Sequence, residues 1–110
     1  MARSTNEPTR LAYLSEQLYR LGKFRAAEAT ARNAIQQASD YRDGYNALAA
    51  AQLALGDEKA AGRSLETSID LDRASGYTWY LRSKVAAAEG DEDAARTYRE
   101  QARALGYPAD

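Results

Sequence analysis

The sequence of 110 residues contains no cysteine, no histidine, two prolines and only one residue each of methionine, tryptophan and phenylalanine. Without cysteine or histidine, the chain cannot form disulfide bonds, zinc sites that use those residues, thiolate nucleophiles or imidazole acid–base catalysts. No apolar run approaches the ~18 residues of a membrane-spanning helix, and the opening residues MARSTNEPTR lack the apolar core of a signal peptide. We therefore expect no membrane partner, and the cytoplasm is the default location.

The chain also lacks an excess of charge of either sign. It has 15 lysines and arginines against 16 aspartates and glutamates, for a net charge of −1. A protein that neutralises nucleic-acid phosphates needs a basic surface, and this balance does not supply one. We expect no nucleic-acid partner.

What the sequence does contain is a repeat with a period of 34 residues. The segment LSEQLYRLGKFRAAEATARNAI, residues 14–35, aligns with residues 48–69 and again with residues 82–103. The matched positions hold glycine (Gly22, Gly56 and Gly90) and pairs of alanines (26–27, 60–61 and 94–95). Three copies in one register are the signature of a repeat architecture.

Each copy predicts a helical hairpin. Apolar residues occur at helical spacing on both sides of the glycine. In the first copy, Leu14, Leu18 and Leu21 precede it, and Ala27, Ala31 and Ile35 follow it. Glycine readily adopts the left-handed conformation that ends a helix. Asp57 and Asp91 directly follow the second and third glycines, where a carboxylate can cap the next helix.

The alanines after each glycine are expected at the point where the two helices of a hairpin cross. Helices joined by so short a turn must approach closely, and a larger side chain would push them apart. The predicted contacts are Ala27, Ala61 and Ala95 on the second helices, against Ser15, Ala49 and Ser83 on the first helices.

This pattern of period, small residues, turn glycine and following alanine resembles the tetratricopeptide repeat (TPR) family. The resemblance covers residues 8–107 as three repeats, 8–41, 42–75 and 76–107, between an N-terminal tail (1–7) and a C-terminal tail (108–110). It implies an all-α fold, an α-α superhelix or solenoid of three TPR-like helical hairpins with six helices. The third repeat departs most, because Arg82 stands where the other two repeats have leucine, and the orientation of its first helix is left open.

The family resemblance also implies a concave groove lined by the first helix of each repeat. The positions that face this groove in the family are Tyr13, Glu16, Tyr19, Arg20, Asn46, Ala50, Leu53, Tyr77, Tyr80, Leu81 and Lys84. Tyrosine combines a large contact area with a polar tip and is enriched at recognition surfaces. We therefore predict a non-enzymatic scaffold that binds a peptide or amphipathic helix of another protein. The expected anchors are Tyr13, Tyr80 and Leu53, and Asn46, Glu16 and Lys84 are expected to orient the partner.

Two other readings of the same residues remain open. The tyrosines could serve only to bridge neighbouring repeats, or the module could form homo-oligomers through the groove or through an uncapped last helix. The family members that grip a C-terminal carboxylate are a poor match, because Glu16 would repel that group.

No residue is assigned a catalytic, metal-binding or cofactor-binding role. The acidic run 91–93 suits the start of a helix. The segment that begins at Asp70 resembles a calcium loop only in its first positions, because Leu81 stands where the closing glutamate is needed.

Overall fold

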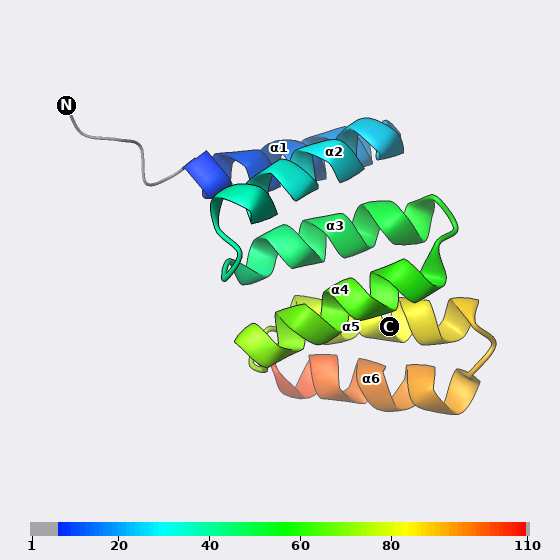
Figure 1. Cartoon of the computed structure of the whole chain (residues 1–110). Helices are drawn as coiled ribbons and strands as arrows, with labels where there is room; N and C mark the ends of the chain where they lie inside the picture. The colour runs from blue at the N-terminus through cyan, green and yellow to red at the C-terminus, as the bar shows by residue number, and fades with distance from the viewer. Residues whose placement is uncertain (1–6, 110) are drawn as a thin grey trace.

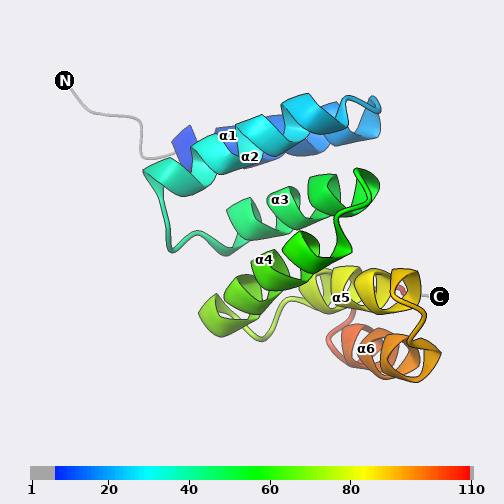
Figure 2. The ribbon, with the colours of Figure 1, turned by 45° about the vertical axis from the view of Figure 1, so that its right-hand side comes forward.

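The computed structural model describes residues 7–109, and within that range every regular element is a helix (Figure 1). The six helices are α1 (Glu7–Arg20), α2 (Phe24–Gln37), α3 (Arg42–Ala54), α4 (Glu58–Leu71), α5 (Gly76–Ala88) and α6 (Glu92–Ala104). They form three hairpins, α1–α2, α3–α4 and α5–α6, that stack from one end of the molecule to the other (Figures 1 and 2). The predicted all-α fold of six helices is confirmed.

The turn inside each hairpin is built around the predicted glycine. Gly22, Gly56 and Gly90 have φ angles of 79°, 84° and 84°, a conformation that residues with a side chain rarely adopt. The residue after each glycine donates its N–H back to the carbonyl oxygen five residues earlier, at 2.9 Å in all three turns. The aspartates Asp57 and Asp91 then cap α4 and α6, as predicted.

The small residues lie where the helices of each hairpin cross. Ala27, Ala61 and Ala95 have no exposed surface, and their predicted neighbours on the first helices are also buried. In the first hairpin, the Ser15 hydroxyl donates a hydrogen bond of 2.7 Å to the carbonyl oxygen of Ala27. The Ser15 side chain on α1 therefore touches the backbone of α2. The two helices can approach this closely only because the residues at the contact are small.

Neighbouring hairpins are joined by a hydrogen bond that repeats with the sequence. The Tyr45 hydroxyl donates to the carbonyl oxygen of Ser39, and the Trp79 indole N–H donates to the carbonyl oxygen of Arg73, both at 2.8 Å. Tyr45 and Trp79 occupy the same position in successive repeats, so one type of contact ties the start of each hairpin to the end of the one before it.

The orientation of α5, which the sequence left open, is set by Leu81 and Val85. Both side chains are buried in a core cluster with Ala49, Ala61 and Leu65. Arg82 is half-buried between α4 and α6, with its guanidinium 3.9 Å from the Glu66 carboxylate and 5.3 Å from the centre of the Tyr98 ring.

The apolar stripe predicted for the first helix is only partly used. Leu21 is 71% exposed and Leu14 is 48% exposed. In the described part of the chain, α1 contacts only α2 and α3, so these leucines lie on a side that no other element covers.

The two expected tails lie at the edges of the described range. Residues 1–6 of the N-terminal tail lie outside it, and Glu7 begins α1. In the C-terminal tail, Ala109 is buried, and its carbonyl oxygen accepts a hydrogen bond from the Arg103 guanidinium. None of the helices described is both long and apolar enough to cross a membrane.

Candidate functional site

The first helices of the three hairpins line a groove that consists of two adjoining hollows. The first hollow, of about 290 Å³, lies between α1 and α3 and reaches Tyr77 at the start of α5. The second hollow, of about 510 Å³, lies between the later parts of α1 and α5. Glu16 and Tyr77 line both hollows, so the two spaces form one continuous surface, called the groove below.

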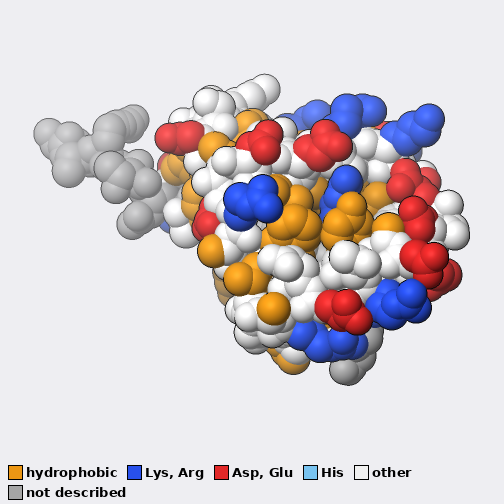
Figure 3. All heavy atoms as spheres, turned by 90° about the horizontal axis from the view of Figure 1, so that it is seen from below, with side chains coloured by type: hydrophobic (Ala, Val, Ile, Leu, Met, Phe, Trp, Pro, Cys, Tyr) orange, Lys and Arg blue, Asp and Glu red, His pale blue; other side chains and the backbone are white. Residues whose placement is uncertain are grey.

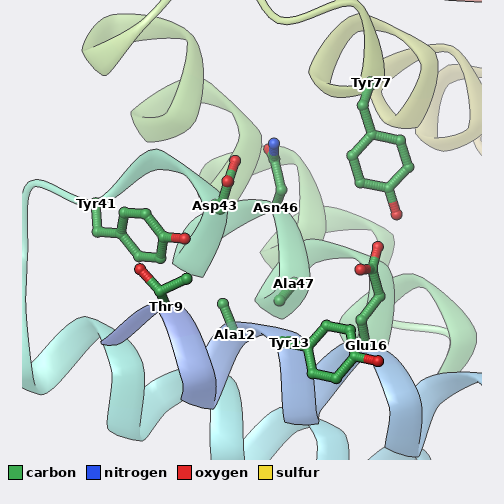
Figure 4. Close-up of a pocket in the computed structure, with 9 residues that line it drawn as sticks. All are labelled: Thr9, Ala12, Tyr13, Glu16, Tyr41, Asp43, Asn46, Ala47 and Tyr77. Atoms are coloured by element: carbon green, nitrogen blue, oxygen red, sulfur yellow. The ribbon is translucent and has the colours of Figure 1, made fainter. Parts of the chain in front are cut away.

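The first hollow combines aromatic rings with carboxylates. Its tyrosines are Tyr13, which is 63% exposed, Tyr41 from the turn before α3, and Tyr77. Figure 4 shows the ring of Tyr13 beside Glu16 and the hydroxyl of Tyr77 pointing toward the Glu16 carboxylate from the opposite wall. α1 and α5 therefore face each other across this part of the groove.

The second hollow is lined by four tyrosines and two cations. The rings of Tyr77 and Tyr80 lie 5.6 Å and 5.0 Å from the ring of Tyr107, which follows α6. The Lys84 ammonium lies 5.2 Å from the centre of the Tyr80 ring and donates to the Tyr80 hydroxyl at 3.3 Å. Arg20 and Tyr19 complete the wall on α1. This end of the groove is therefore aromatic and basic.

Burial raises the pKa of Tyr77, and the negative charge of Glu16 is the next largest cause. Burial also raises the pKa of Tyr107, with Tyr80 as the second cause. Both phenols therefore stay neutral at physiological pH and can donate or accept hydrogen bonds.

Seven of the predicted groove residues line the hollows as half-buried or exposed side chains. They are Tyr13, Glu16, Tyr19, Arg20, Tyr77, Tyr80 and Lys84. The rings of Tyr19 and Tyr77 also pack against the core cluster, so these two residues hold the hairpins together as well as lining the groove.

The predicted residues of the central hairpin lie deeper than expected. Ala50 is buried in the core cluster and Leu53 packs against it, and neither lines a hollow. Leu81 touches the second hollow but is only 4% exposed, so it is a core residue rather than an open contact. The physical reason is that α3 is the central first helix, which packs mainly against α4 and α2 and also meets α1 and α5.

Asn46 is also an interior residue, 3% exposed, at the floor of the first hollow. Its amide nitrogen donates to the Thr78 hydroxyl at 2.9 Å, and its amide oxygen accepts from the Ser68 hydroxyl at 2.7 Å. These bonds join α3 to α4 and α5, so the amide is used inside the protein instead of being free for a partner.

Two tyrosines of the groove were not predicted from the sequence. Tyr41 is the last residue before α3, and Tyr107 is placed by Gly106, whose φ angle of 92° turns the chain back after α6. A usable signal was present, because Leu105–Gly106 repeats the leucine–glycine pair that ends α1. Tyr107 approaches α5 so closely that a Cβ atom on Gly76 would lie 2.7 Å from the Tyr107 Cβ atom.

No group of three or more acidic residues that could hold a metal ion occurs within residues 7–109. The groove offers rings, hydroxyls and isolated charges of both signs, and these groups suit the binding of another molecule.

Comparison with known proteins supports the fold. No protein-family model matches the sequence, and no curated protein matches it. The chain is similar to solved structures of SycD, the type III secretion translocator chaperone of Yersinia enterocolitica. One of them, an alternative dimer, has a TM-score of 0.83 and 19% identity, over 93% of this chain and 77% of that one. A second SycD structure has a TM-score of 0.83 and 18% identity, over 96% of this chain and 80% of the other.

A third similar structure holds SycD in complex with a peptide of the translocator YopD. It has a TM-score of 0.81 and 17% identity, over 96% of this chain and 80% of that one. At so low an identity, the likeness shows the fold alone. The class that the fold defines is an all-α protein of stacked, TPR-like helical hairpins.

Proposed function

We propose that this protein is a non-enzymatic binding module whose groove takes a peptide or an amphipathic helix of another protein. The observation that carries the proposal is the continuous groove. Tyrosines from the first and third hairpins line it, and Glu16 lies where its two hollows meet. The SycD structure with a YopD peptide supports it, because a protein of the same fold forms a complex with a peptide. SycD is a chaperone, which agrees with a role in binding rather than catalysis.

The test is a selection of short random peptides displayed on phage against the immobilised protein. Enriched peptides are synthesised and titrated by calorimetry against the wild type and the double variant Tyr13→Ala, Tyr80→Ala. Since each residue is a large ring on a wall of the groove, the double variant should weaken binding by at least about tenfold.

The matched control is the double variant Leu14→Ala, Leu21→Ala. It removes two exposed apolar side chains, one on α1 and one in the turn after it, that lie outside both hollows. If the control variant loses as much affinity as the tyrosine variant, or if no peptide is enriched at all, the groove is not the binding site.

Tyr107 tests the same site from its other side. Tyr107→Ala removes the ring that packs on Tyr77 and Tyr80 and should weaken the selected peptides by about fivefold to tenfold. Tyr98→Ala, which removes a ring from α6 outside the groove, should leave peptide binding unchanged. Circular dichroism confirms that both variants are folded.

A second candidate function is self-association through the end of the molecule formed by α5 and α6. Figure 3 views this end and shows apolar side chains in its middle with acidic and basic side chains around them. On α5 and α6, Trp79 and Tyr98 are partly exposed, and Leu105 directly after α6 is 38% exposed. Light scattering over a range of concentrations decides between the two candidates. The groove proposal predicts a monomer throughout, whereas self-association predicts dimers and a concentration-dependent emission of Trp79.

A further inference from the structure

Glu16 has an unusual position in the groove, because among residues 7–109 it is the only acidic residue that lines both hollows. None of the ion pairs within residues 7–109 involves Glu16. The other acid of the first hollow, Asp43, is different, because Arg42 lies 2.7 Å from its carboxylate. Glu16 therefore presents a negative charge that the described part of the protein does not pair.

The surroundings of Glu16 favour a cation. The Glu16 carboxylate points toward the hydroxyl of Tyr77, and Tyr13 and Tyr41 line the same hollow (Figure 4). An ammonium or guanidinium group is attracted both to a carboxylate and to the faces of aromatic rings. The raised pKa of Tyr77 agrees with a negative charge at this place, since Glu16 is its second cause after burial.

The charges of the second hollow limit where such a cation can lie. Arg20 and Lys84 line that hollow, and a basic side chain placed there would meet two like charges. The acidic first hollow and the basic second hollow thus give the groove a direction. A positive group of a partner is favoured in the first hollow, because none of the described residues that line it is basic.

We infer that the first hollow is a subsite for one lysine or arginine side chain of the bound segment, held against Glu16 among the three tyrosines. The inference rests on the proposed function and adds which side chain of the bound segment the groove would select. The size of the hollow, about 290 Å³, is sufficient for one such side chain. The carboxylates that line this hollow would repel a carboxylate of the partner and attract a cation.

The experiment uses the same phage-displayed random peptides, selected in parallel against the wild type, Glu16→Gln and Glu16→Lys. Peptides selected by the wild type should share a lysine or arginine at one position, and those selected by Glu16→Lys should not. A wild-type peptide should bind Glu16→Gln about tenfold more weakly, and added salt should weaken its binding to the wild type more than to Glu16→Gln. The matched control is Glu100→Gln, which makes the same change in net charge at an exposed position of α6 and should leave the affinity unchanged.

Two contrary results are distinguishable. Peptides that need Tyr13 and Tyr80 but carry no shared basic residue, or that bind Glu16→Gln as tightly as the wild type, overturn the cation subsite and leave the proposed function standing. If no peptide is enriched on any of the three proteins, both the subsite and the proposed function are refuted.

Discussion

Asn46 provides the sharpest test of how the hairpins are held together. Its amide bridges Thr78 on α5 and Ser68 on α4, and all three side chains are almost fully buried. Replacing Asn46 with alanine removes both hydrogen bonds and leaves two hydroxyls without this partner. Each lost bond costs about 0.5–1.5 kcal/mol, and the space left by the amide adds about 1 kcal/mol.

The expected loss for Asn46→Ala is therefore about 2–4 kcal/mol of the free energy of unfolding. For a domain of this size, that loss lowers the melting temperature by roughly 10–30 °C. Urea denaturation followed by circular dichroism measures the free energy, and a thermal scan measures the temperature. Asn33→Ala is the matched control, because Asn33 is exposed on α2, and we expect a change within about 0.5 kcal/mol.

A double-mutant cycle with Thr78→Val separates the bond from the general effect of truncation. If the two side chains interact as the 2.9 Å distance indicates, the double variant should lose less stability than the sum of the single variants, by about 0.5–3 kcal/mol. Strict additivity, or an Asn46→Ala protein as stable as the control, would refute the assignment of Asn46 to the interior.

Three further predictions concern packing and pH. Ala27→Leu should destabilise the protein by about 1–3 kcal/mol because it overfills the crossing of α1 and α2, whereas Ala26→Leu, on the exposed side of α2, should have little effect in the same denaturation experiment. Gly76→Ala should lower the melting temperature, because its new Cβ atom would lie 2.7 Å from the Cβ atom of Tyr107; an unchanged melting temperature would contradict this packing. Ultraviolet titration should show that Tyr77 ionises above the ordinary tyrosine pKa of 10.0, since burial raises its pKa. The neutral Tyr77 phenol contributes to the stability of the folded protein below pH 10, and this contribution is lost as the pH rises toward the folded-state pKa. A Tyr77→Phe protein should lack the late ionisation.

The hairpins were predictable because their causes are local. A glycine that must take a positive φ angle, an aspartate after it and an alanine at the crossing act within a few residues of one another. Gly56, Asp57 and Ala61 all do what the sequence predicted. The same reasoning applied to Gly106 would have indicated the turn that places Tyr107.

The groove was less predictable than the hairpins. The family position of a residue indicates which side of its own helix it lies on, and for Tyr13 and Lys84 this was enough to place them on the hollows. It was not enough for Ala50 and Asn46 on α3, because both side chains are buried in contacts with α4 and α5.

The sequence alone therefore determined the repeat, the six helices and the points at which each pair crosses, since these depend on contacts between residues close together in the chain. The tertiary structure decided which side chains remain accessible, and it brought Glu16 opposite Tyr77 and Tyr107 onto Tyr80. Glu16 and Tyr77 come from different hairpins, and Tyr107 reaches Tyr80 from the far end of α6. Both approaches depend on how the helices pack, which no short segment of the sequence encodes.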